Sequence, residues 1–353
     1  MITEAMVNLV FEDCRKSCTN IDIFSALQGQ SILVTGGTGF MGKWIAEMIS
    51  YINATRSYNI QLCLLGRDIQ RFKDEVPHLA EKEFIALIEQ DVRNIHDLPE
   101  NINYIIHAAG SPDNREHASQ PLRMIETFYK GTQAVLDAST RLSDLKNIVH
   151  ISSHQVYGEN DSQLLINEEY LGRLKSDSIN HTYAEAKRIT ETLCSVYRSH
   201  FKLPIILMRP FAFIGPYQDL EKPWAINNFI RDGILGESIR ILGNGQTTRS
   251  YLYASDMAFW ILTALISGKT GESYNLGSKN SITLEDLANK VRSSLNNNIE
   301  IITKSSKSIY TNFTRLVPDT SKIVKAFNVD ETHSLDDSIK RTIVWNQLNR
   351  SKF

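Results

Sequence analysis

A tyrosine and a lysine that could carry out acid–base chemistry lie four residues apart in the stretch YAEAK, as Tyr183 and Lys187. On a helix this spacing puts both side chains on one face, so the ammonium can lie beside the phenol. A free phenol titrates near ~10, too high for a base at neutral pH, but an adjacent cation favours the phenolate. Tyr183 could then take a hydroxyl proton while a nicotinamide takes the hydride from the same carbon. The pair therefore predicts a redox site, with a purely structural helix pair as the alternative.

Ser153 supplies a third polar group, at the end of the strand-like run Lys146 to Ser152 and 183 − 153 = 30 residues before the tyrosine. Its hydroxyl could bond the reacting oxygen and help to place it. His154 follows directly and could act as an acid or base, because its unperturbed pKa is near ~6.5. Gln155 cannot exchange a proton at neutral pH. An alternative for both residues is that they only hydrogen-bond the substrate or line the wall of its pocket.

Alternating elements must position these groups. Apolar strand-like runs alternate with longer stretches of helical spacing, which is typical of parallel strands joined by helices. The runs are SILVT, IQLCLL, FIALIEQ, NYIIHAA, NIVHISS and PIILMR. After Arg209 the elements become shorter, as in ESIRIL, RSYLY and ESYNL, followed by helix-like segments near 282–296 and 335–347. The pattern predicts an α/β fold, a Rossmann-type doubly wound parallel sheet with a smaller C-terminal α/β substrate-binding lobe.

We predict three parts for the chain. Residues 1–29 form a short helical extension, residues 30–209 the NAD(P)-binding domain, and residues 210–353 the smaller lobe, which could also interleave with the domain before it. The sequence does not indicate a role for the extension.

A cofactor turn follows the first strand, in TGGTGFMG at residues 35–42. Its glycines allow a tight turn and close approach of the backbone to a pyrophosphate, which the next helix attracts with its N-terminal amides. The residues expected at the cofactor here are Gly36, Thr38, Gly39, Phe40, Met41 and Gly42. The second strand ends in LLGRD, where Gly66 occupies the position at which NAD-selective enzymes usually have an acid. Arg67 could accept a 2′-phosphate, so we expect NADP slightly ahead of NAD, although Asp68 could still reach a ribose.

These motifs together resemble the extended branch of the short-chain dehydrogenase/reductase superfamily, which works on nucleotide sugars. The resemblance rests on GxxGxxG, YxxxK and SSHQVYG and covers residues from about 30 to the end of the chain. It implies that Asp91 and Val92 lie at the adenine, that Ala108, Ala109 and Gly110 form a turn beside the cofactor, and that Tyr157 is structural. One departure is Phe128, which stands where the family has an asparagine.

The family's reaction type depends on the two positions held here by His154 and Gln155. In nucleotide-sugar 4,6-dehydratases of the family they are typically Asp-Glu, and in decarboxylases the second is often Glu, so both carboxylates are missing. A 4-epimerase needs only Tyr183, Ser153 and the cofactor. The resemblance therefore favours a 4-epimerase, with dehydratase, ketoreductase or decarboxylase chemistry as alternatives and a non-catalytic NAD(P)-binding regulator as a remote one.

The smaller lobe contains a segment similar to the family's diphosphate-binding strand, ILGNGQTTRSYLYASDMA at residues 241–258. The resemblance assigns Arg249 to the diphosphate of the substrate, as a charge-assisted donor, and Asp256 to the cap of the next helix. In RPFAFIGPY the usual asparagine is Ala212, and either Asn227 or Asn228 could serve instead.

Composition excludes other classes of partner. The 353 residues carry a net charge of −2, with 42% hydrophobic and 22% charged residues, which offers no bulk attraction for nucleic acid or membrane. No apolar run reaches the length of a membrane span, so we expect a cytoplasmic protein. The four cysteines have no zinc or disulfide spacing, so we expect no metal site. The family implies a homodimer built from helices near 122–142 and 183–201.

Overall fold

A computed structural model describes residues 2–159, 165–295, 299–303 and 315–349 of the chain. Its centre is a seven-stranded sheet in the order β10-β6-β5-β4-β1-β2-β3, in which every neighbouring pair is parallel. The strands are β1 (Ser31–Thr35), β2 (Gln61–Gly66), β3 (Ile85–Glu89), β4 (Tyr104–His107), β5 (Asn147–Ile151), β6 (Ile205–Pro210) and β10 (Ser273–Leu276). The predicted doubly wound fold is confirmed, and the strand order reverses between β1 and β4.

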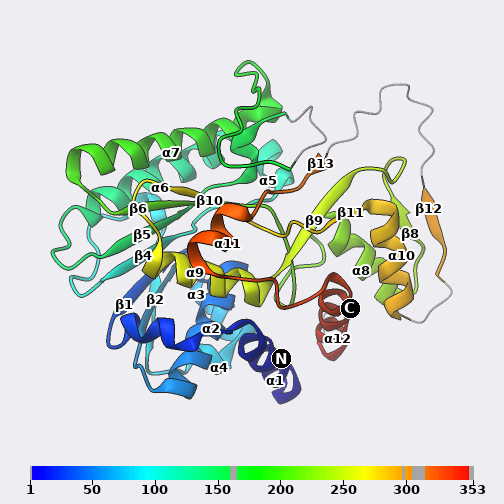
Figure 1. Cartoon of the computed structure of the whole chain (residues 1–353), viewed down its shortest axis with the longest axis horizontal. Helices are drawn as coiled ribbons and strands as arrows, with labels where there is room; N and C mark the ends of the chain where they lie inside the picture. The colour runs from blue at the N-terminus through cyan, green and yellow to red at the C-terminus, as the bar shows by residue number, and fades with distance from the viewer. Residues whose placement is uncertain (1, 160–164, 296–298, 304–314, 350–353) are drawn as a thin grey trace.

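Helices cover both faces of this sheet (Figure 1). On one face α2 (Phe40–Arg56) packs against α9 (Ala254–Ser267), and on the other α6 (Pro121–Ser139) packs against α7 (Thr182–Phe201). Because both faces are covered, the strands read as continuous apolar runs, and all five residues of β1 are buried. Shorter helices follow β2 and β4, namely α3 (Ile69–Glu75), α4 (Pro77–Ala80) and α5 (Asn114–Ser119).

A smaller lobe lies at the carboxyl ends of the strands. Its strand β9 (Thr248–Tyr253) pairs with β7 (Ala212–Ile214), β11 (Ser281–Thr283) and β13 (Arg315–Leu316), while β8 (Ile239–Ile241) pairs with β12 (Ile301–Thr303). Helices α8 (Ala225–Leu235), α10 (Leu284–Leu295), α11 (Ser321–Phe327) and α12 (Leu335–Leu348) complete the fold.

The sequence assigned the run ESYNL to the smaller lobe, and this placement was wrong. The run forms β10, which pairs in parallel with β6 at the edge of the large sheet. Helix α9, just before it, also packs on the large sheet's side. A short apolar run does not reveal which sheet it joins, because that choice depends on the connection rather than on the residues.

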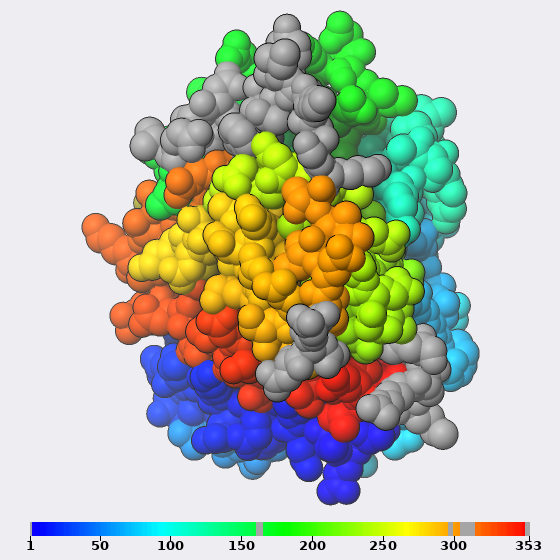
Figure 2. Space-filling view, turned by 90° about the vertical axis from the view of Figure 1, so that its right-hand side faces the viewer, coloured from blue at the N-terminus to red at the C-terminus, as the bar shows by residue number. Residues whose placement is uncertain are grey.

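The N-terminal extension folds as α1 (Glu4–Ser17) and the 3₁₀ helix η1 (Ile21–Leu27), as its apolar spacing predicted. Helix α1 packs against α2, α9 and α12, and Figure 2 shows the N-terminal residues in blue beside the C-terminal helix in red. Its Asp13 is fully buried, accepts a hydrogen bond of 2.7 Å from the Tyr253 hydroxyl, and forms an ion pair with Arg341. The extension therefore joins the first sheet's helices to the smaller lobe, a role that the sequence did not reveal.

Candidate active site

The glycine-rich turn lies between β1 and α2, at the switch point of the sheet. Gly36 has φ +69°, and a Cβ atom there would lie 2.7 Å from the Ala108 carbonyl oxygen. A Cβ atom at Gly42 would collide with the backbone of Gly37, so the turn admits only glycine at both positions. Gly39 is the N-cap of α2 and offers no side-chain cap, which leaves the first amides of a helix of 17 residues for a ligand. This cradle fits the pyrophosphate of a dinucleotide.

The turn after β4 closes the other side of the predicted cofactor site. Its residues Ala108, Ala109 and Gly110 follow a strand that pairs directly with β1, and Ala108 packs on Gly36. Gly110 has φ +134°, and a Cβ atom at this position would collide with the ring of Phe128. The structure thus brings together the two cofactor segments that the sequence predicted.

The end of β2 explains why the ribose-binding acid is missing. A Cβ atom at Gly66 would collide with the side chain of Thr38 from the glycine-rich turn, so an acid has no room there. Arg67 follows and is exposed, whereas the Asp68 carboxylate accepts a hydrogen bond of 2.9 Å from the Arg71 amide as the N-cap of α3. The position of the usual acid is therefore followed by an exposed arginine.

Asp91 and Val92 lie after β3, where the resemblance assigned them to the adenine. The Asp91 carboxylate binds the Arg93 guanidinium at 2.8 Å, and these hydrogen bonds hold its pKa at about 2. Val92 is buried, and a Cβ atom at Gly131 of α6 would lie 2.7 Å from its Cγ1. Within the described residues this carboxylate is engaged by arginine, so its part at the adenine remains a prediction.

Ser153 and Tyr183 meet at the carboxyl end of β5. Ser153 caps the 3₁₀ helix η3 (His154–Tyr157), and its Oγ accepts a hydrogen bond of 3.1 Å from the Gln155 amide. Tyr183 lies in the first turn of α7, and the Ser153 side chain lowers the pKa of its phenol. The loop between β5 and α7 thus brings together two residues that the sequence separates by 30 positions.

Lys187 lies one turn further along α7 and is buried. Its ammonium donates a hydrogen bond of 2.9 Å to the Ile151 carbonyl oxygen and lies 4.3 Å from the centre of the Phe128 ring. Burial lowers the pKa of Lys187 to about 7, while Glu191 acts in the opposite direction. Removal from water disfavours the charged ammonium, and the carbonyl and the ring offset part of that loss.

The expected effect of this ammonium on Tyr183 is not seen in the structure. Burial raises the pKa of Tyr183 to about 12, and the hydrogen bond from Ser153 lowers it only in part. A phenolate favoured by the neighbouring cation therefore stays a prediction. Desolvation disfavours the phenolate, and Lys187 is not among the groups that lower the pKa of Tyr183.

Phe128, which stands where the family has an asparagine, contacts both Tyr183 and Lys187. Its ring stands edge-on to Tyr183, with centroids 5.4 Å apart, and is also the ring beneath the Lys187 ammonium. The face of Tyr183 is covered by His117 of α5, at 4.4 Å between centroids and an angle of 13°. His117 was not predicted from the sequence, because its only signal is a histidine in a short helix after the fourth strand.

His154 and Gln155 line the same loop. The His154 Nδ1 donates a hydrogen bond of 3.1 Å to the Pro210 carbonyl oxygen, and its ring stacks on Phe211. Burial lowers the pKa of His154 to about 4, so the imidazole is neutral at pH 7 and cannot act as an imidazolium acid. This favours the alternative in which His154 only hydrogen-bonds. Gln155 is half-buried beside it.

Tyr157, the tyrosine of VYG, is structural as expected. Its side chain is buried, and its hydroxyl donates a hydrogen bond of 2.5 Å to Asn275 of β10. The Arg209 guanidinium lies over its ring and binds Glu191 at 2.7 Å. This cluster fixes the loop that carries Ser153 to the neighbouring strands.

Arg249 lies on β9 of the smaller lobe and is half-buried. Its Nη1 donates a hydrogen bond of 2.9 Å to the Thr248 carbonyl oxygen, and its charge lowers the pKa of His154. Arg249, the residue predicted to bind the diphosphate, is therefore close enough to the loop after β5 for its charge to act on His154. Burial in turn lowers the pKa of Arg249.

The other residues predicted for the smaller lobe, Asn227, Asn228 and Asp256, lie in helices α8 and α9. Asn227 is buried and its amide donates a hydrogen bond of 2.8 Å to the Asp219 carbonyl oxygen, while Asn228 is half-buried one residue on. Asp256 was expected to cap α9, and this was wrong. Its carboxylate accepts hydrogen bonds from the amide and hydroxyl of Thr332, so it fixes the segment before α12 instead.

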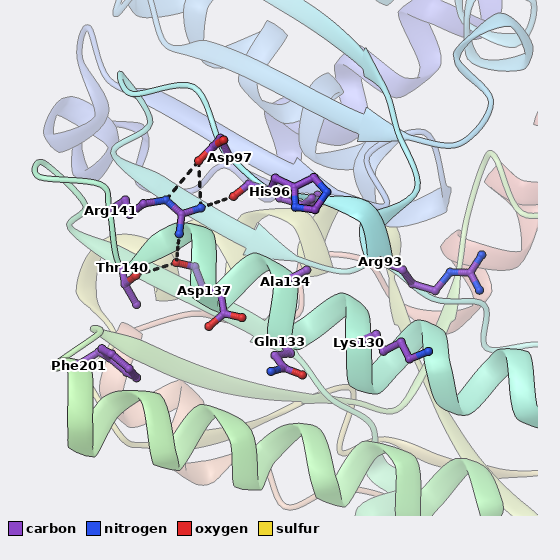
Figure 3. Close-up of a pocket in the computed structure, with 11 residues that line it drawn as sticks. Arg93, His96, Asp97, Lys130, Gln133, Ala134, Asp137, Thr140, Arg141 and Phe201 are labelled. Carbon is purple, nitrogen blue, oxygen red and sulfur yellow. Dashed lines mark hydrogen bonds and ion pairs between the residues drawn. The ribbon is translucent and has the colours of Figure 1, made fainter.

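A pocket of about 660 Å³ lies elsewhere, between η2 (Val92–Asn94) and α6 (Figure 3). Its arginines and lysine are paired with acids: Arg141 with Asp97, Arg93 with Asp91, and Lys130 with Glu126. The pocket is on the outer side of α6 and contains none of the predicted site residues, so we assign no ligand to it.

The described residues contain neither a membrane-spanning helix nor a metal-binding cluster. None of their helices is long and apolar enough to cross a bilayer. No group of three or more histidine, cysteine or acidic side chains among them is arranged to hold a metal ion. Each of the four cysteines, Cys14, Cys18, Cys63 and Cys194, is buried and free.

Comparisons with known proteins agree with this geometry. The sequence profile described as the NAD dependent epimerase/dehydratase family matches residues 32–277. A UDP-N-acetyl-alpha-D-glucosaminuronate decarboxylase of Bacillus cytotoxicus is 24% identical over 320 residues, 89% of this chain and 96% of the relative. A trifunctional UDP-glucose 4,6-dehydratase of Arabidopsis thaliana is 26% identical, over 91% of this chain and 47% of its own.

Solved structures show the same fold. The UDP-glucuronic acid 4-epimerase of Bacillus cereus, solved with UDP-glucuronic acid and NAD, has a TM-score of 0.77 at 24% identity, covering 90% of this chain and 100% of its own. The UDP-glucose 4-epimerase of Thermotoga maritima has a TM-score of 0.76 at 20% identity, covering 91% and 100%. The chain therefore belongs to the NAD-dependent epimerase/dehydratase family, the extended branch of the short-chain dehydrogenases, and is an enzyme of that family.

Proposed function

We propose that this enzyme is a nucleotide-sugar 4-epimerase that works through transient oxidation at carbon 4. The observation that carries the proposal is that Ser153 lowers the pKa of the Tyr183 phenol at the carboxyl end of the parallel sheet, with no carboxylate at positions 154 and 155. Removal of water needs a further acid as well as a base, and the lowered pKa of His154 makes this residue a poor acid. Epimerisation needs only one proton acceptor and donor and a hydride carrier.

The residues divide the work as follows. Ser153 holds the oxygen on carbon 4, and Tyr183 accepts the proton of that hydroxyl as the carbonyl forms. A bound nicotinamide supplies the other half of the chemistry, by accepting the hydride from carbon 4 and returning it to the opposite face. Tyr183 then gives the same proton back to the carbonyl oxygen. Arg249 holds the diphosphate, so that the sugar can turn over without leaving the site.

The product distinguishes this reaction from its alternatives. Purified protein is incubated with UDP-, dTDP-, GDP- and CDP-sugars in deuterated water without added cofactor, and the products are separated and weighed by mass spectrometry. An isomer of unchanged mass that contains no deuterium on carbon supports the 4-epimerase, because the hydride returns from the cofactor. A product that has lost water or carbon dioxide would overturn the proposal in favour of a dehydratase or decarboxylase, and so would no conversion of any sugar.

We further propose that Arg67 binds the 2′-phosphate of NADP and makes NADP the better ligand, although the solved neighbours named above were crystallised with NAD. Gly66 leaves no room for an acid on the ribose, and Arg67 is exposed beside it. The substitution Arg67→Ala is expected to weaken NADP binding about 10- to 100-fold, the usual size of a lost charged hydrogen bond, and to leave NAD binding unchanged. Calorimetry with both nucleotides measures this.

A neighbouring arginine provides the matched control. Arg71 lies in α3 and forms an ion pair with Glu75 at 2.8 Å. The substitution Arg71→Ala should therefore change the binding of neither NAD nor NADP. Equal affinity of the wild type for NAD and NADP, or an equal loss of both in Arg67→Ala, would contradict the assignment.

The enzyme is proposed to be a homodimer in the cytoplasm, built on α6 and α7. These helices expose the large apolar side chains Leu122, Tyr129, Ile189, Val196 and Phe201. We expect the double substitution Ile189→Glu and Val196→Glu to yield a monomer in light-scattering chromatography, because it places two charges in an apolar contact. Leu242→Glu is the control, since Leu242 is even more exposed than Ile189 and Val196 but lies in the smaller lobe. A wild-type monomer would refute the proposal.

A further inference from the structure

His117 makes the closest aromatic contact of the site. Its ring lies nearly parallel to that of Tyr183, with 4.4 Å between centroids, whereas Phe128 approaches the same phenol edge-on at 5.4 Å. Both are buried, and they come from different helices, α5 and α6. The Tyr183 ring is thus stacked on one ring and makes an edge contact with another, and the Ser153 side chain lowers the pKa of its hydroxyl.

One backbone bond fixes the orientation of the His117 ring. Its Nε2 donates a hydrogen bond of 2.6 Å to the Ser111 carbonyl oxygen. The Nδ1 atom is therefore the unprotonated nitrogen of this tautomer, and it is buried without a hydrogen-bond partner among the described residues. The buried Nδ1 of His117 therefore does not face solvent.

Helix α5 is itself tied to the smaller lobe. The Lys222 ammonium, in the loop before α8, binds Asp113 at 3.0 Å and Glu116 at 3.2 Å. Arg115 donates a hydrogen bond of 2.9 Å to the Glu221 carbonyl oxygen. A short helix of six residues would not keep its position alone, and these bonds anchor it on the part of the chain that carries α8.

We propose that His117 is a positioning residue for Tyr183, whose flat ring keeps the phenol aligned with Ser153 and connects that alignment to the smaller lobe through α5. The inference rests on the proposed role of Tyr183 as the proton acceptor and donor. His117 acts through the tyrosine rather than on the substrate, because its free nitrogen is buried and its other nitrogen is occupied. Small displacements of a reacting group are expensive in rate, so the contact has a measurable consequence.

Two substitutions distinguish the contribution of the His117 ring from that of its nitrogen atoms. His117→Phe keeps a flat ring against Tyr183 and removes both nitrogens, whereas His117→Ala removes the ring. We expect His117→Ala to lower kcat about 10- to 100-fold, as for a misplaced catalytic group, with KM little changed, and His117→Phe to restore most of kcat. His200→Ala is the control, because His200 is exposed in the last turn of α7. An equal loss in both His117 variants, or no loss in either, would overturn the proposal.

A second measurement does not depend on turnover. The phenol of Tyr183 is followed by nuclear magnetic resonance of protein with ¹³C-labelled tyrosine, and its signal is assigned with Tyr183→Phe. In wild type and in His117→Phe the signal should stay that of a neutral phenol up to pH 10, because the buried phenol has a raised pKa. In His117→Ala water reaches the ring, so titration should begin near its ordinary value of about 10.

This readout keeps the two proposals apart. If Tyr183→Phe retains turnover, the proposed function fails, yet the resonance still reports whether His117 holds the tyrosine. If the resonance of His117→Ala remains identical to that of the wild type across the pH range, the positioning role is refuted, whatever the reaction of the enzyme.

Discussion

Tyr183→Phe is expected to lower kcat about 10²- to 10⁴-fold, the range for a lost general acid–base, while the cofactor and the nucleotide sugar still bind. The phenylalanine keeps the contacts with His117 and Phe128 but cannot exchange a proton or bond Ser153. Single-turnover formation of reduced nicotinamide measures the oxidation step directly, and calorimetry measures binding. The two results together show whether the hydroxyl serves the reaction or only the fold.

The matched control is Tyr157→Phe, which removes the hydroxyl of a buried tyrosine in η3, the 3₁₀ helix that Ser153 caps. Its partner is Asn275 of β10, away from the glycine-rich turn, so this variant should lose thermal stability rather than kcat per folded molecule. Turnover by Tyr183→Phe within a few-fold of wild type would remove Tyr183 from the reaction and with it the proposed mechanism.

The pH dependence of the oxidation step follows from the same hydroxyl. Burial raises the pKa of Tyr183 to about 12, so at neutral pH nearly all molecules hold a neutral phenol. The phenolate fraction of such a group rises with pH at every value below its pKa, and proton acceptance by Tyr183 should become faster in the same direction. Return of the proton to the carbonyl oxygen needs the opposite form, so the reductive step should slow as the pH rises.

Much of the fold could be predicted because its signals are local. The apolar runs that form β1 and β5 are buried on both sides and lie where the sequence placed them. The glycines at 36 and 42 predicted a tight turn, and their surroundings leave no space for a side chain. The assignment of β10 failed because sheet membership is decided by long-range pairing, which a run of five residues does not encode.

The site was predictable where it depends on spacing along one element and not where several elements meet. Tyr183 and Lys187 share a face of α7, as their separation required. The protonation of both residues depends on burial, to which Phe128 and His117 contribute from α6 and α5. No periodicity in the sequence reports which side chain will cover another from a different helix, so the raised pKa of Tyr183 and the stack on His117 required the structure.

Substitution of Arg249 is expected to have the second large effect, on the binding of the nucleotide sugar. Arg249 is a cation of the smaller lobe that lies close enough to His154 to lower its pKa. It is half-buried on β9, where burial lowers its pKa, and its charge acts on His154. A diphosphate bound there would accept bidentate hydrogen bonds from the guanidinium, which would fix the position of the diphosphate. Loss of one partner of a buried charged pair costs about 2–5 kcal/mol, which corresponds to a loss of affinity of roughly 30- to several thousand-fold.

Arg249→Met is therefore expected to raise KM for the nucleotide sugar by about 30-fold or more, with nucleotide cofactor binding unchanged. Arg249→Lys keeps the charge but loses the planar fork, so its KM should lie between those of the wild type and Arg249→Met. Arg240→Ala is the control, since Arg240 lies exposed on β8 of the same lobe. Competition by the free nucleoside diphosphate tests the contact itself: an inhibition constant that is equal in wild type and Arg249→Met would show that the arginine holds the strand and not the substrate. Arg249→Met could instead weaken the binding of the free nucleoside diphosphate and of the whole nucleotide sugar by the same factor. The entire effect would then lie at the diphosphate, because the sugar would contribute the same binding free energy in the wild type and the variant.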